Sequence, residues 1–178
     1  MRRSTRINGA TVATLALAVS LAACGTSDDD AAEAQPQPRL TAHPCDVFGP
    51  DARASAGIDK REPERYQDRE EPYQRRSCSY MSSDPYSSVL VSFNGFPISD
   101  VDDDDRFTRT QEAEIVGRRT VVDDFPGGLQ CLASVDFDPG VLEVMVGYEQ
   151  SDIDTSEQAC PLALKVAQDL APYFPEHL

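Results

Sequence analysis

The chain has 178 residues, with 31 acidic and 16 basic side chains and a net charge of −15 at neutral pH. A surface this acidic repels nucleic acid, and the sequence has no basic stripe. Nucleic acid is therefore excluded as a partner. The length that remains after an N-terminal leader suits one domain with one hydrophobic core.

The first 23 residues have the pattern of a bacterial export signal. Arg2, Arg3 and Arg6 precede residues 11–23, which are apolar or small and too short to span a bilayer. The four residues that end at Cys24 (Leu-Ala-Ala-Cys) form a lipobox. We therefore expect a signal peptide at residues 1–23 and acyl chains, such as palmitate, on Cys24. The alternative is an ordinary signal peptide with an incidental cysteine.

Residues 24–43 are expected to form a lipidated, flexible tether. They contain three consecutive aspartates and several prolines and glutamines, without apolar periodicity, and such a composition buries too little surface to fold. Two acyl chains anchor a protein stably without crossing the bilayer. The predicted location is the extracytoplasmic face of the cell membrane.

Residues 44–178 are predicted to form a single α+β domain. A short helix is expected between Gly49 and Gly57, with Pro50 in its first turn. Residues 60–76 are charged and aperiodic, which favours a loop. Residues 156–171 have the apolar stripe of a helix, although Pro161 lacks an N–H and favours a regular start only there.

Between the two helices, six segments have strand character. They are residues 77–82, 87–94, 112–116, 118–122, 130–137 and 141–148. Val89, Val91 and Phe93 alternate with polar residues, as they do in a half-buried strand. The last two segments form the clearest hairpin, with a Pro-Gly turn between them. We expect an antiparallel sheet of about five or six strands, a short N-terminal helix and a longer C-terminal helix.

Four cysteines remain after Cys24, an even number that predicts two disulfides in an exported domain. They are Cys45, Cys78, Cys131 and Cys160. Three pairings are possible, and we favour Cys45–Cys78 with Cys131–Cys160, which join neighbours in sequence. No C-x-x-C pair is present, and the two histidines after Cys24, His43 and His177, lie near the ends of the domain, so neither a metal nor a redox centre is expected.

Several of these features follow one another in an order that resembles a known family. They are the lipobox, Pro44-Cys45-Asp46, Gly57, Cys78-Ser79-Tyr80, Val116-Gly117-Arg118, Cys131 and Ala159-Cys160. Together they resemble actinobacterial lipoproteins classed as a domain of unknown function (number 3558). Tyr80 departs from the pattern, since the family often has tryptophan there. The resemblance implies a compartment and a class, and it implies no activity, cofactor or catalytic residue.

The acidic run at residues 100–105 is the one cluster that resembles a ligand set. Asp100, Asp102 and Asp104 match the first three positions of a calcium loop. Asp105 stands where the loop needs glycine, and Gln111 where it needs a bidentate glutamate. We therefore expect a solvated acidic loop and no metal site.

Catalytic motifs are lacking, and no G-x-S-x-G elbow is present. Aromatic residues in Phe96-Pro97, Phe125-Pro126 and Tyr173-Phe174-Pro175 either line a groove or, as we favour, seal the edges of the core. The sequence thus favours a non-enzymatic lipoprotein that binds a partner protein or a small ligand in the cell envelope. The alternatives are an envelope hydrolase of unrecognised type and a structural accessory subunit of an envelope complex.

Overall fold

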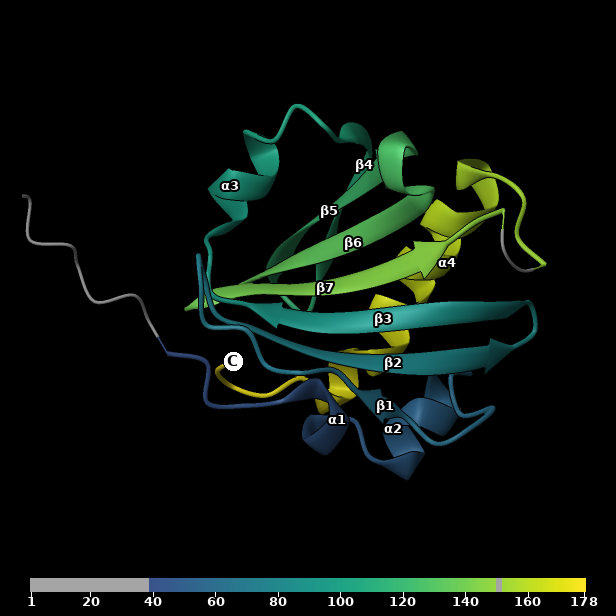
Figure 1. The fold of residues 1–178 in the computed structure, drawn as a ribbon, viewed down its shortest axis with the longest axis horizontal. Coiled ribbons are helices and arrows are strands. Elements are labelled where there is room, and N and C mark those ends of the chain that lie inside the picture. Colours follow the sequence, from purple (N-terminus) through teal and green to yellow (C-terminus); the bar gives the residue numbers. More distant parts are fainter. Residues whose placement is uncertain (1–38, 150–151) are drawn as a thin grey trace, which may run out of the picture. The chain divides into compact units, whose positions relative to one another are not determined.

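The structure, a computed structural model, describes residues 39–149 and 152–178. Its centre is a seven-stranded antiparallel sheet with the strand order β1-β2-β3-β7-β6-β5-β4 (Figure 1). The strands are β1 (Glu64–Arg65), β2 (Arg75–Ser83), β3 (Tyr86–Asn94), β4 (Thr108–Ile115), β5 (Arg118–Phe125), β6 (Gln130–Phe137) and β7 (Gly140–Gly147). The helices are α1 (Pro44–Val47), α2 (Pro50–Ser55), α3 (Ile98–Asp102) and α4 (Ser156–Leu170), with 3-10 turns η1 (Pro126–Gly128) and η2 (Ala171–Tyr173).

The predicted antiparallel sheet is confirmed, but it has seven strands instead of five or six. The six predicted segments correspond to β2 through β7. The additional strand is β1, whose two exposed residues pair with Cys78 and Ser79 on β2. Two exposed residues are too few to show an alternating apolar pattern, so this segment has the sequence of a loop.

Two single-turn helices were also not predicted. In α1 the ring nitrogen Nδ1 of His43 accepts a 3.1 Å hydrogen bond from the Cys45 N–H, and Pro44 occupies the first helical position. Such a cap depends on local residues alone, so α1 has no apolar periodicity from which it could be predicted. The other helix, α3, follows Pro97 and buries Val101 alone, so it has no apolar stripe to detect.

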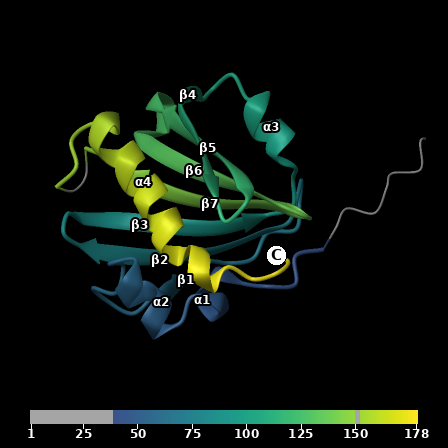
Figure 2. The same ribbon diagram turned by 180° about the vertical axis from the view of Figure 1, so that it is seen from behind.

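Helix α4 crosses one face of the sheet, as Figure 2 shows. It begins at Ser156, so the expectation of a regular start at Pro161 is wrong. A proline inside a helix removes one intrahelical hydrogen bond. The disulfide between Cys160 and Cys131 of β6 joins the first turns of the helix to the sheet, and this tertiary link offsets the local loss.

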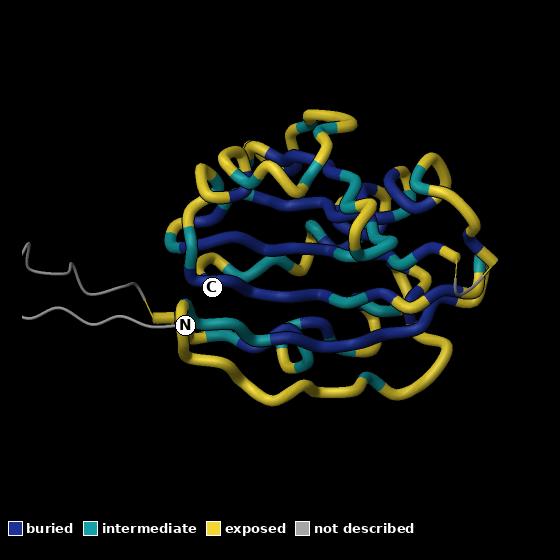
Figure 3. Tube along the Cα trace, turned by 45° about the horizontal axis from the view of Figure 1, so that its top comes forward, coloured by how far each residue is buried: buried dark blue, intermediate teal, exposed yellow. Residues whose placement is uncertain are grey.

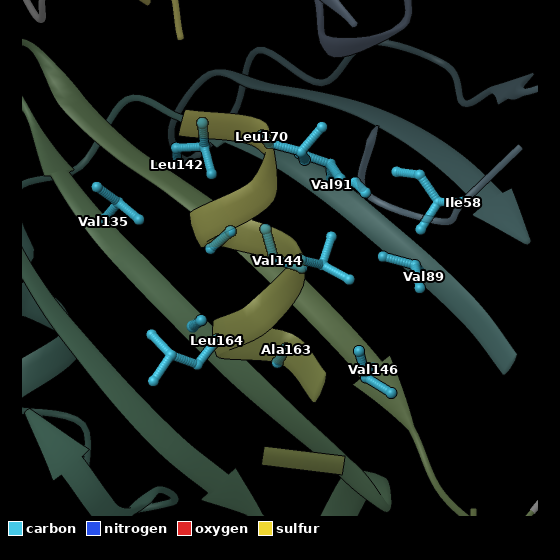
Figure 4. Close-up of a cluster of buried hydrophobic side chains, with 14 of the residues drawn as sticks. Ile58, Val89, Val91, Val135, Leu142, Val144, Val146, Ala163, Leu164 and Leu170 are labelled. Carbon is cyan, nitrogen blue, oxygen red and sulfur yellow. The ribbon is translucent and has the colours of Figure 1, made fainter. Parts of the chain in front are cut away.

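The hydrophobic core lies between α4 and the sheet. In Figure 4, Leu142, Val144 and Val146 of β7 face Ala163 and Leu164 of α4. The predicted core positions of β3 are confirmed, since each of its three alternating apolar side chains is fully buried. Burial of one such side chain contributes about 1.5–3 kcal/mol, so this layer dominates the stability of the fold.

The structure contains the two disulfides that the sequence favoured. Cys45 of α1 bonds to Cys78 of β2, with 5.3 Å between their Cα atoms. Cys131 bonds to Cys160 of α4, with 5.0 Å between their Cα atoms. Each bond therefore holds a helix against a strand of the sheet.

Contacts with the domain begin at Leu40, four residues before the predicted start at Pro44. Leu40 is buried and its N–H donates a 2.7 Å hydrogen bond to the Gln74 side chain. The Thr41 N–H donates to the carbonyl of Leu178 at 3.0 Å. The predicted signal peptide and most of the predicted tether, with Cys24, lie outside the described residues. Across residues 39–149 and 152–178, every helix is too short or too polar to cross a bilayer.

Candidate functional site

The sheet face opposite α4 is here called the open face, because no long helix covers it. This face is nevertheless buried. Strands β6 and β7 are buried at consecutive positions instead of alternate ones, and Figure 3 shows the central strands buried along most of their length. Ser92, Glu143 and Ser134 lie side by side on β3, β7 and β6 of this face, with exposed fractions of 3%, 5% and 0%. Residues 66–75 and 96–107 flank this face and supply the missing cover.

A cavity of about 460 Å³, here called the inner compartment, opens on this face between those two segments. Its floor comes from β6 and β7, through Gln130, Leu132, Glu143 and Met145. A volume of this size is typical of sites for small ligands.

Two pairs of aromatic rings form two walls of the inner compartment. Tyr73 and Phe96 meet edge to face, with 4.7 Å between ring centroids. Phe107 and Phe125 are tilted, with 5.1 Å between centroids. Edge-to-face and tilted pairs of this kind are favourable arrangements of the ring quadrupoles, so both walls are held before a ligand arrives.

Arginine side chains stack on both aromatic walls. The guanidinium groups of Arg69 and Arg75 lie 5.7 and 5.6 Å from the Tyr73 ring centroid. Arg106 lies 5.7 Å from the ring of Phe107, and its Nε donates a 2.8 Å hydrogen bond to Asp104. These contacts hold the guanidinium groups in the lining of the inner compartment.

The carboxyl group of Glu143 is the buried acid of the cavity floor. Asn94 donates a 2.7 Å hydrogen bond to its Oε2, and the Arg75 guanidinium lies 3.6 Å from the same oxygen. Burial raises the pKa of Glu143 above its ordinary value, and the positive charge of Arg75 opposes that rise.

A second buried acid, Asp123 on β5, belongs to an arginine network beside the cavity. Arg109 donates hydrogen bonds to Asp123 at 2.6 Å and to Asp102 of α3 at 2.9 Å. Arg119 also donates to Asp102, at 2.7 Å. Hydrogen bonds from Arg119 and Arg109 lower the pKa of Asp102 to about 2. The network therefore ties α3, and with it one side of the cavity, to β4 and β5.

A smaller hollow of about 200 Å³, here called the outer compartment, continues the cavity along the open face. The two compartments share Gln130 and Met145. Tyr66, Ser79 and Ser88 supply its hydroxyl groups. Together the compartments form one groove, called below the open-face groove.

The structure places the acidic run 100–105 on α3 and just after it. Asp102 and Asp104 are engaged by arginines, and both Asp100 and Asp104 line the inner compartment. Within the described part of the chain, no group of three or more His, Cys, Asp or Glu side chains is arranged to hold a metal ion.

The loop aromatics divide between the two roles that the sequence left open. Phe96 and Phe125 line the inner compartment. Phe174 instead packs edge to face against Phe48 and Phe137 and closes the core. Neither disulfide contributes to the lining of the groove.

Sequence reasoning missed the polar side of the groove. Glu143 lies between apolar residues of β7, and a lone acid in an alternating strand has the pattern of a solvent-facing position. Arg69 and Tyr73 lie in a charged, aperiodic segment that predicts only a loop. Only the folding of that segment over the sheet brings these residues together.

The fold and the groove define a class: an α+β domain with one antiparallel sheet, whose one face holds a helix and whose other face holds a ligand-sized groove. The chain belongs to the family described as "Protein of unknown function (DUF3558)", whose sequence model matches residues 19–173. No curated protein and no solved structure matches the chain.

Proposed function

We propose that this protein is a membrane-anchored extracytoplasmic lipoprotein that binds a small ligand of the cell envelope in the open-face groove, without converting it. The observation that carries the proposal is the inner compartment, whose two aromatic walls and buried floor are set by contacts within the protein. A pre-formed cavity with a few convergent polar groups is typical of ligand sites. The lipobox and the disulfides support the envelope location.

An envelope hydrolase is the second candidate, because Glu143 combines a raised pKa with a place in the cavity floor. Acid–base hydrolysis by carboxyl groups uses two of them on either side of the scissile bond. The other acids of the lining are Asp104, which is engaged by Arg106, and Asp100, which is exposed to solvent. The other buried acid, Asp123, does not line the groove. Among the described residues of the lining, Glu143 is therefore the only buried acid, and this favours binding.

The test is ligand capture from native membranes. The full-length protein is purified in mild detergent and denatured, and the released small molecules are identified by mass spectrometry. Met145→Trp places a large ring where the two compartments meet, whereas Tyr86→Trp makes a similar change at an exposed position outside the groove. We expect a compound released by wild type and by Tyr86→Trp but not by Met145→Trp. Equal release from all three proteins would reject the groove as the site. Products of bond cleavage after incubation with the compound would favour the hydrolase.

A further inference from the structure

We propose that the ligand of the open-face groove is a neutral oligosaccharide that lies across strands β2, β3, β7 and β6. This assignment rests on the proposed function and names its ligand class. It is carried by the arrangement of apolar and polar rows on the groove floor.

The first observation is an apolar strip that crosses the sheet. Leu90, Met145 and Leu132 are direct neighbours on β3, β7 and β6, and Ser79 of β2 pairs with Leu90. Adjacent strands lie about 4.8 Å apart, so the row from Ser79 to Leu132 spans roughly 14 Å and its apolar part, from Leu90 to Leu132, spans about 10 Å. A row of this length accommodates a chain of a few sugar rings.

The second observation is that polar side chains border this strip on both sides. Ser88 and Gln130 line the groove on one side, and Glu143 lines it on the other. A sugar ring has an apolar face of C–H groups and hydroxyl groups around its edge. The floor therefore offers apolar contact to the ring face and hydrogen-bonding groups to the ring edge.

The charges of the inner compartment disfavour the other ligand classes. Three arginines and three acids line it, so neither sign is in excess. Arg75 and Arg106 each lie beside an acid of the same cavity. A phosphorylated or otherwise anionic ligand meets no surplus of positive charge in a strongly acidic protein. An acyl chain would remove these charged groups from water without replacing their hydrogen bonds, which is costly.

Asp100 is the side chain best placed to report on a sugar hydroxyl. It lines the inner compartment, and among the described residues no side chain forms an ion pair or hydrogen bond with its carboxylate. Loss of a hydrogen bond to a charged carboxylate typically weakens binding about tenfold or more. Asp103 is the C-terminal capping residue of the same short helix and is exposed, but it does not line the groove, so it supplies a matched control.

The test uses the full-length protein in mild detergent. Its probes are oligomers of N-acetylglucosamine, mannose and arabinose, each with one to four rings, together with glucose 6-phosphate and decanoate. Binding is measured by saturation-transfer NMR and calorimetry. We expect at least one neutral series to bind, with affinity that rises from one ring to three. We expect Asp100→Asn to weaken this binding by about tenfold or more and Asp103→Asn to leave it unchanged.

Two results would overturn the assignment. Binding of decanoate or glucose 6-phosphate that Met145→Trp abolishes, with no binding of any neutral series, would reject the sugar and keep the groove as a ligand site. Binding of a neutral series that is unaffected by Met145→Trp and by Asp100→Asn would place the sugar elsewhere. Compounds captured from native membranes are also hydrolysed in acid and analysed for sugars, and a captured compound without sugar rejects the assignment independently.

Discussion

The side-chain amide of Asn94 on β3 donates a 2.7 Å hydrogen bond to the carboxylate of Glu143 on the neighbouring strand β7. Both side chains are buried. Arg75 of β2 engages both of them, because its Nε donates to Asn94 Oδ1 at 2.6 Å and its guanidinium lies 3.6 Å from Glu143. Three adjacent strands are thus joined by a polar cluster directly beneath the groove. Buried polar groups that have partners specify one arrangement and are costly to disrupt.

The raised pKa of Glu143 predicts how stability depends on pH. The folded state holds this proton more tightly than the unfolded chain, whose carboxyl has a pKa near 4.5. The stability contributed by Glu143 is therefore fully present below that value and is lost as the pH rises through the folded pKa. We expect Glu143→Gln to equal wild type in acid and to be at least as stable at pH 8, as measured by urea denaturation at both pH values.

A matched variant removes the hydrogen-bond partner of Glu143 and keeps the charge of its carboxylate. Asn94→Ala leaves the Glu143 carboxylate without its hydrogen-bond donor, so we expect a loss of about 2 kcal/mol at pH 8. A Glu143→Gln protein that is clearly less stable than wild type at pH 8 would contradict the cost assigned to the buried charge.

The lowered pKa of Asp102 predicts the opposite dependence of stability on pH. Its pKa falls to about 2 in the folded protein, so its contribution is present above the unfolded value of 3.8 and is lost as the pH falls toward 2. We expect Asp102→Asn to cost about 0.5–1 kcal/mol at neutral pH, and less in high salt, because the pair lies at the surface. Thermal melts at pH 7 and pH 3 measure this, and Asp103→Asn is the control. If Asp102→Asn loses the same stability at pH 7 and at pH 3, the loss does not come from the ion pairs of Asp102.

Gly140 is required by the turn between β6 and β7. Its φ is +101°, and a Cβ atom there would overlap the backbone oxygen of Asn94. Gly117 also has a positive φ, of +78°, but has open space around it. We expect Gly117→Ala to cost about 1–2 kcal/mol, from the backbone conformation alone. Gly140→Ala should cost clearly more, and equal losses in denaturant titrations would disprove the steric argument.

The disulfides are expected to be a large part of the stability of the exported domain. Their Cys pairs are separated by 33 and 29 residues, which in the chain-entropy model corresponds to about 3–4 kcal/mol each. We expect Cys131→Ala/Cys160→Ala to lose about this much, and mass spectrometry of non-reduced peptides to recover both pairs. Crossed pairs, or four free thiols in the exported protein, would contradict the framework.

Lipid attachment at Cys24 is tested by fractionation. We expect Cys24→Ala to lose the mass of the acyl chains and the N-terminus that begins at residue 24. Globomycin, an inhibitor of lipoprotein signal peptidase, should produce the uncleaved form of wild type alone. A wild-type N-terminal peptide without added mass would refute lipidation.

The α4 side of the fold could be predicted from the sequence because its signals are local. Alternation at Val89, Val91 and Phe93 places apolar side chains on one face of β3, and the apolar stripe of residues 156–171 marks the helix that covers them. The burial of Glu143 could not be predicted in this way, because the same alternation on β7 assigns its side chain to the solvent-facing side.

The sequence by itself determined the fold class, the two helices that flank the sheet and most strand positions, since each depends on periodicity within a short segment. It also predicted an export signal, which stays a prediction. Only the tertiary structure decided that the second face of the sheet is covered and hollowed. That face is made by segments such as 66–75 and 96–107, which have no periodicity and reach it across the chain. Long-range packing, with the burial of Glu143 and the stacking of Arg69 on Tyr73, creates the groove, and no local pattern encodes it.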